Sequence, residues 1–122
     1  MIQTTEQLIV DIANASISYG DSLEAGDSKK ANTANSIALK AFDRLLAKGE
    51  QDRIFQLLEF AHPSVRLMAA SIGMRIDPQR AEPVLRDLAN GPNGAVCAMA
   101  NSFLKFWYEQ TPGIYQPLNT TS

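Results

Sequence analysis

The chain has 122 residues, of which 45% are hydrophobic and 20% charged, and its formal net charge is −2. These values are typical of one globular domain. They disfavour a nucleic-acid binder, which usually shows a basic balance, and no run reaches the roughly 18 apolar residues of a membrane span. Cys97 is the only cysteine and no secretory pattern opens the chain, so we expect a cytoplasmic protein.

Two long helices are predicted over residues 5–25 and 29–48. Thr4 and Gln7 form a capping box for the first, and Gly26-Asp27-Ser28 separates the two. Gly20 lies inside the first pattern and is expected to loosen that helix or end it early. Apolar residues at helical spacing form the predicted buried stripes: Leu8, Ile12, Ala15, Tyr19, Leu23, Ala31, Ala34, Ala38, Ala41, Phe42 and Leu45.

Four further helices are predicted, over residues 50–60, 65–74, 78–89 and 95–109. Pro63-Ser64 and Asp77-Pro78 are helix-start signals, because proline suits the first helical position and Asp the N-cap. Residues 90–94 form a loop rich in glycine and asparagine. We assign residues 1–110 to one helical domain and residues 111–122 to an irregular tail.

The third to sixth predicted helices contain an internal repeat. A shift of 31 residues superposes apolar positions in one register: Ile54 on Leu85, Leu57 on Leu88, Val65 on Val96, Ala69 on Ala100 and Ile72 on Phe103. The first two helices do not fit that register and are interpreted as a divergent terminal hairpin. The predicted fold is therefore all-α: a short right-handed α-solenoid of three antiparallel helical hairpins.

The segment from Pro63 to Ala70 resembles the second-helix start of a HEAT repeat, although Phe60 and His62 occupy the region where Asp often precedes the Val-Arg pair. The wider chain is similar to a family of small bacterial HEAT-like proteins over residues 18–108. The features that carry this resemblance are Gly26-Asp27, Lys30-Ala31-Asn32, Leu57-Leu58, Val65-Arg66, Ala81 and Trp107. The resemblance implies a protein-binding role, since some members act as immunity proteins for bacterial toxins.

Residue patterns of an enzyme are absent from the sequence. It has no phosphate-binding glycine loop, nucleophile elbow or metal-ligand spacing, so we predict no catalytic residue, no metal and no cofactor. His62 is interpreted as a turn residue near a helix start and Cys97 as a small, inert, partly buried residue.

Charge is distributed unevenly along the chain. Residues 1–28 contain five carboxylates and no basic residue, which leaves +3 on the remainder. One interpretation is a solvated helix face. The other is an acidic docking surface, contributed by Asp11, Ser18, Asp21, Glu24 and Asp27, for the basic cleft of a nuclease toxin.

Two further residues are candidates for partner binding. Arg66 lies in the first turn of its predicted helix, where the macrodipole disfavours a cation by roughly 0.3–1 kcal/mol. We expect a carboxylate to offset this, from a neighbouring hairpin or from a partner. Tyr108 is the surface candidate of the Phe106-Trp107-Tyr108 cluster, whereas Trp107 is assigned to the core.

Taken together, the sequence predicts a non-enzymatic immunity protein that blocks the active site of a cognate antibacterial toxin, such as a nuclease of contact-dependent growth inhibition. The partner would be a basic toxin domain, with no nucleic acid or membrane involved, and the chain would be a monomer or a heterodimer with that partner. Two alternatives stay open. One is a generic HEAT-like scaffold or adaptor; the other is a small enzyme or nucleic-acid binder, which needs a basic concave face.

Overall fold

The computed structural model describes residues 3–110 and, within them, contains helices and no strand. The elements in chain order are α1 (Thr5–Glu24), α2 (Ser28–Ala47), η1 (Gln51–Glu59), α3 (Pro63–Gly73), α4 (Pro78–Ala89) and α5 (Ala95–Gln110). The all-helical class and the six elements are confirmed. The predicted tail of residues 111–122 lies outside the described residues. No helix in the described part is long and apolar enough to span a membrane.

Helix boundaries follow the local capping chemistry. Thr4 and Gln7 form the predicted capping box, and the Asp27 carboxylate accepts a hydrogen bond from the Lys30 amide at 3.0 Å to start α2. Gly26 adopts a φ of 72°, which favours glycine after a helix end. Of the two expectations for Gly20, an early end of α1 is wrong, since the helix continues to Glu24.

Gly20 is instead a packing position. A Cβ atom built at residue 20 would lie 1.8 Å from Ser64 Oγ and 2.6 Å from Ser64 Cβ. The missing side chain therefore allows the first turn of α3 to approach α1 closely. Glycine within a helix lowers stability by about 1 kcal/mol relative to alanine. It occurs here because the two helices are too close for a side chain.

The third predicted helix, over residues 50–60, is present and has 3₁₀ geometry. Gln51–Glu59 is a 3₁₀ helix and not an α-helix. Ile54 and Leu57, three residues apart and both fully buried, lie on one side of a helix with three residues per turn. The extended backbone of Phe60 then ends the element.

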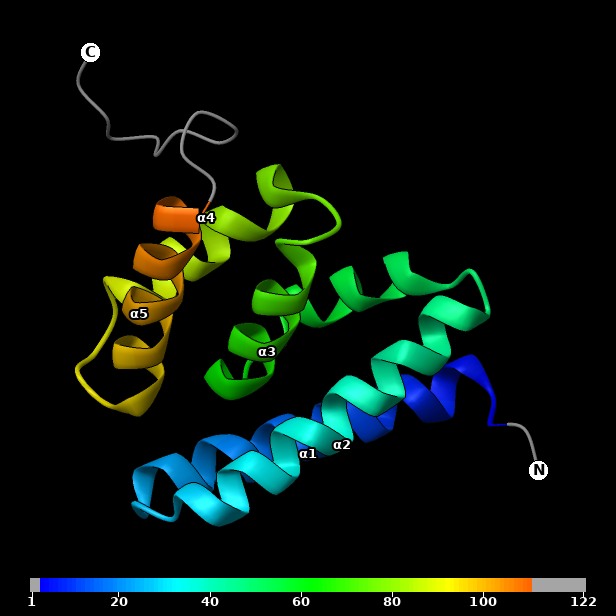
Figure 1. The fold of residues 1–122 in the computed structure, drawn as a ribbon, viewed down its shortest axis with the longest axis horizontal. Coiled ribbons are helices and arrows are strands. Elements are labelled where there is room, and N and C mark those ends of the chain that lie inside the picture. The colour runs from blue at the N-terminus through cyan, green and yellow to red at the C-terminus, as the bar shows by residue number, and fades with distance from the viewer. Residues whose placement is uncertain (1–2, 111–122) are drawn as a thin grey trace.

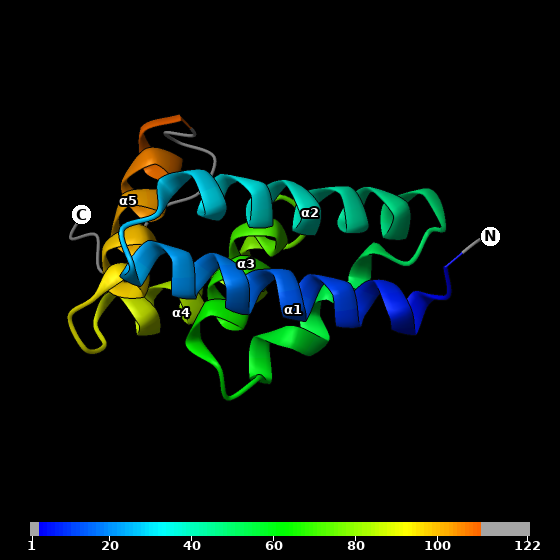
Figure 2. The ribbon, with the colours of Figure 1, turned by 90° about the horizontal axis from the view of Figure 1, so that it is seen from below.

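Six helices form two layers (Figures 1 and 2). The α1–α2 hairpin is one layer, and η1, α3, α4 and α5 lie on one side of it. α1 packs along α2 and also against α3, α5 and η1, whereas the backbone of α2 closely approaches only α1 and η1. The pairs η1–α3 and α4–α5 pack as consecutive hairpins, but this arrangement does not confirm a regular solenoid of three equivalent hairpins.

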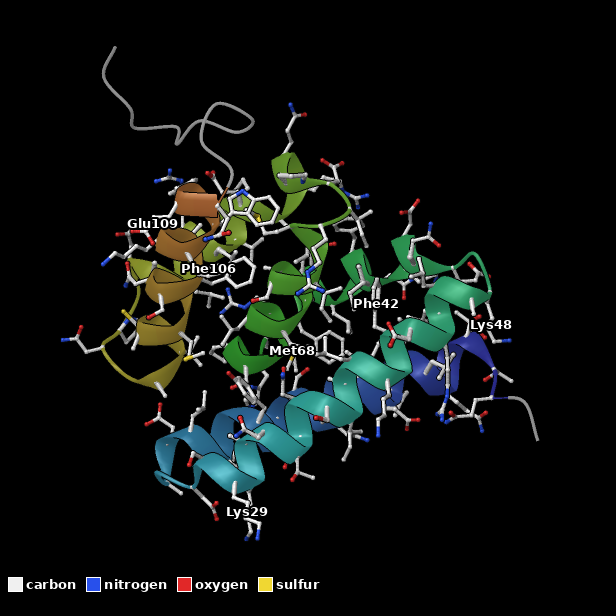
Figure 3. All side chains as sticks on the ribbon, viewed as in Figure 1. Lys29, Phe42, Lys48, Met68, Phe106 and Glu109 are labelled. Atoms are coloured by element: carbon white, nitrogen blue, oxygen red, sulfur yellow. The ribbon has the colours of Figure 1, made fainter. Side chains whose placement is uncertain are left out.

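The interior consists of two adjoining apolar clusters. One joins the hairpin to η1 and α3, and the other joins α3 to α4 and α5. Met68 belongs to the first cluster and lies on the side of α3 that faces the hairpin (Figure 3). Tyr19 contacts both clusters, and its pKa is raised by burial. The core thus contains side chains from only the inner side of the hairpin.

Candidate functional site

The outer side of the α1–α2 hairpin is not covered by any described helix (Figure 2). Because side chains three or four positions apart share one helix face, the residues of this surface can be stated from their spacing and exposure. We call it the hairpin face and define it by Val10, Asp11, Asn14, Ser18 and Asp21 of α1 and by Lys30, Thr33, Ile37, Lys40 and Arg44 of α2.

A shallow groove of about 440 Å³ runs along the hairpin face between the two helices. Ala15 and Ala34 form its floor, where small side chains bring the helices together. Its walls carry polar side chains and one apolar one: Asp11, Asn14, Ser18, Lys30, Thr33 and Ile37. A second shallow pocket, lined in part by Ser18, Asp21 and Lys30, continues it toward the hairpin loop.

The hairpin face carries both signs of charge. α1 has four carboxylates and no basic residue, whereas α2 has four basic residues and one carboxylate. Within residues 3–110, neither Asp21 nor any lysine of α2 takes part in an ion pair. Figure 3 shows Lys29 extending from the hairpin into solvent. The predicted acidic surface therefore has a basic surface beside it.

The hairpin face also exposes two large apolar side chains. Val10 is 55% and Ile37 52% exposed. Single exposed apolar residues are common on protein surfaces, but these two lie on a face that already carries a groove. Ile37 and Lys40 are surface residues that were not predicted from the sequence. The signal that would have found them is the helical spacing of residues 30, 33, 37, 40 and 44, which are polar or basic except for Ile37 and mirror the outer face of the first helix.

The structure brings together only part of the predicted acidic set. Asp11, Ser18 and Asp21 share the hairpin face, where Asp11 accepts a hydrogen bond from Gln3 Nε2 at 2.6 Å. Gln3 Oε1 in turn accepts from Arg44 Nη1 at 2.8 Å, so this side chain bridges the two helices. Asp27 serves as the N-cap of α2 and also lines the pocket at the loop end together with Ser18 and Asp21.

Glu24 and Arg66 line a different pocket, of about 530 Å³, between α3, α4 and the start of α5. Glu24 Oε1 accepts a hydrogen bond from the Ala95 amide at 2.9 Å and so binds the N-terminal end of α5. No carboxylate among residues 3–110 forms an ion pair with Arg66, whose Nε is buried without a hydrogen-bond partner there. The expected carboxylate from a neighbouring hairpin is thus absent from the described residues.

Tyr108 belongs to a polar cluster between α4 and α5. Its hydroxyl donates to Glu82 Oε2 and accepts from Arg86 Nη2 at 2.7 Å, while Arg86 Nε lies 3.0 Å from Glu82 Oε1. Burial and the hydrogen bond to Glu82 raise the pKa of Tyr108. Burial lowers the pKa of Arg86, but its interactions with Glu82 outweigh this and leave the pKa raised. Tyr108 therefore satisfies a fully buried carboxylate, and its position ties two helices together.

The remaining candidates have local structural partners. His62 is the N-cap of α3, and its Nδ1 accepts a hydrogen bond from the Ser64 amide at 3.2 Å, as expected of a residue at a helix start. Cys97 Sγ donates to the Ala89 carbonyl at 3.3 Å. Trp107 is half-buried and stacks against Phe103 with ring centroids 6.3 Å apart. In the described part of the chain no three His, Cys, Asp or Glu side chains are grouped to hold a metal ion.

Comparisons with protein-family models, with curated proteins and with solved structures found no match to this chain.

Proposed function

We propose that the chain is a protein-binding module that docks on another protein through the hairpin face. The observation that carries this proposal is an uncovered two-helix surface with a groove, exposed apolar side chains and unpaired charges. A partner would place basic groups opposite Asp11 and Asp21, with Ser18 as a hydrogen-bonding group between them. It would avoid placing them over Lys30 and Lys40, since like charges across an interface disfavour binding.

The class of partner that we propose is a bacterial toxin domain, because the sequence resembles HEAT-like immunity proteins. In that role the hairpin would cover the active site of the toxin and its α1 carboxylates would pair with basic residues of the cleft. Association would be fast at low ionic strength and would slow as salt screens the charges. As part of this proposal, η1–α3 and α4–α5 are two HEAT-like units of a right-handed solenoid in a cytoplasmic protein, with the α1–α2 hairpin as its cap.

One observation favours a scaffold or adaptor as the second candidate. The basic side chains of α2 give the face both signs of charge, which a blocker of a purely basic cleft does not need. The two candidates differ in their genetic setting: an immunity gene lies directly beside the gene of its toxin, whereas an adaptor gene need not.

The test is affinity capture from the native organism, followed by calorimetric titration of the captured partner. We expect Asp21→Lys to weaken binding at least about tenfold, because it removes a carboxylate that has no partner within the described chain. Glu109→Lys, which makes the same charge change on α5, is the matched control and should bind like the wild type. Unchanged affinity of the Asp21→Lys variant would refute the assignment of the surface. Glu24 is not a suitable test residue, because its carboxylate binds the start of α5.

A further inference from the structure

We infer that a second copy of this chain occupies the hairpin face and forms a two-fold dimer in which α1 of each copy lies antiparallel on α2 of the other. The inference rests on the proposed function to the extent that the hairpin face binds protein. When no other protein is bound, the partner at this face is a second copy of the chain.

The charges of the hairpin are self-complementary, and within residues 3–110 of one copy Asp21 and the lysines of α2 form no ion pair. α1 carries carboxylates toward both of its ends and no basic residue, whereas α2 carries four basic residues and one carboxylate, Asp43. In residues 3–110 the one ion pair made by either helix joins Glu6 of α1 to Arg53 of η1 at 3.1 Å. A partner that is basic throughout would match α1 and repel α2. A second hairpin of the same chain presents both signs with the same spacing.

Symmetry selects one arrangement of two such faces. A two-fold axis that lies in the interface across the helices would put α1 on α1 and α2 on α2, so that like charges meet. An axis that lies in the interface parallel to the helices puts α1 of each copy over α2 of the other, so that opposite charges meet. Isologous contacts of this kind are self-complementary and close at two copies.

The register of the hairpin then pairs particular residues. The groove residues of α1, centred near Asn14 and Ala15, lie beside those of α2, centred near Thr33 and Ala34. Asp21 lies with Lys30 at the loop end of the hairpin, where both line one pocket. In the dimer the Asp21 carboxylate of one copy therefore meets Lys30 of the other. Farther from the hairpin loop, Asp11 of one copy meets Lys40 of the other.

The apolar content and the size of the face fit a modest dimer. Two 20-residue helices span about 30 Å by about 20 Å, or roughly 600 Å² of flat surface on each copy. This is near the roughly 800 Å² per partner of a standard specific interface. Ile37, 52% exposed at the groove, would be covered by the opposing α1. These values predict reversible association that depends on protein concentration and on salt.

The experiment is sedimentation equilibrium of the full chain over a range of protein concentrations and at two salt concentrations. We expect the wild type to approach the mass of a dimer and salt to weaken it. Asp21→Lys and Lys30→Asp should each raise the dissociation constant about tenfold or more. The double variant should restore the wild-type value, because the exchanged charges meet across the two-fold axis. Glu109→Lys is the charge-matched control and should dimerise like the wild type.

A wild type that stays monomeric at concentrations near 1 mM, or a double variant that remains as weak as the single ones, would overturn the dimer. These outcomes are distinct from failure of the proposed function. If the chain is monomeric but the Asp21→Lys variant loses a captured partner, the hairpin face is a protein-binding surface for another chain. If neither association depends on Asp21, both proposals fail.

Discussion

Replacing Gly20 by alanine separates helix propensity from helix packing. On propensity alone, alanine in the interior of α1 would raise the free energy of unfolding by about 1 kcal/mol. The structure predicts the opposite sign. The new Cβ would lie 2.6 Å from Ser64 Cβ, and rotating the Ser64 hydroxyl away does not move that atom. Since carbon atoms in contact prefer about 3.5–4 Å, α3 must move away from α1 by roughly 1 Å.

The expected magnitude follows from these two effects. Overpacking of a buried contact costs about 1–3 kcal/mol, and the propensity gain offsets about 1 kcal/mol of it. Gly20→Ala should therefore lower the free energy of unfolding by up to about 2 kcal/mol. Chemical denaturation followed by circular dichroism measures this value.

Two further variants test whether the contact with Ser64 causes the loss of stability. Ser64→Gly removes both contacting atoms, so Gly20→Ala in that background should stabilise the protein by about 1 kcal/mol relative to Ser64→Gly alone. Ser18→Ala, at an exposed position of the same helix, should raise stability by a few tenths of a kcal/mol. If Gly20→Ala stabilises the wild-type protein, or if the Ser64→Gly background leaves its effect unchanged, the close approach of α1 and α3 is not what the glycine serves.

Three other substitutions give measurable predictions. Tyr108→Phe should lower the free energy of unfolding by about 1–3 kcal/mol, because it leaves the buried Glu82 carboxylate without its hydroxyl donor. Because the pKa of Tyr108 is raised in the folded protein, its contribution to the free energy of unfolding is complete below the pKa of the unfolded state, near 10, and is lost as the pH rises above that value. Denaturation at several alkaline pH values should therefore show a smaller decline in the free energy of unfolding for Tyr108→Phe than for the wild type. Arg66→Gln should leave thermal stability unchanged or raise it by about 0.3–1 kcal/mol, because a cation is removed from a helix start; a clear loss of stability would mean that Arg66 has an internal carboxylate partner. Glu24→Gln should lower stability by about 0.5–1 kcal/mol through its weaker hydrogen bond to the start of α5, and protection of that helix from amide exchange should fall with it.

The positions of the helices were predictable because their ends are local events. Each helix start depends on residues within one turn, so the sequence alone suffices to place it. The residues concerned are Thr4, Asp27, Pro63 and Pro78. The geometry of η1 was not predictable, because the spacing of its apolar residues suits α and 3₁₀ helices alike. The role of Gly20 was also hidden, since the atom that it accommodates belongs to a residue 44 positions later.

The candidate site was only partly predictable for the same physical reason. The acidic character of residues 1–28 is a property of the sequence, but which carboxylates remain free depends on contacts between distant segments. Arg53 forms an ion pair with Glu6, and the Ala95 amide donates a hydrogen bond to Glu24. The basic helix α2 also changes the charge of this surface, since it places Lys30 beside Asp21 at one pocket. Lateral packing, and not local propensity, decides which charges a partner meets.

Both proposals depend on protein binding at the hairpin face. Hydrogen–deuterium exchange of the full chain, measured at low and high protein concentration and with any captured partner, tests it most directly. If the hairpin face binds protein, peptides covering residues 10–21 and 30–44 gain protection on association, while peptides from α4 and α5 do not change. Protection confined to α4 and α5, or no change anywhere in the hairpin under either condition, would contradict it.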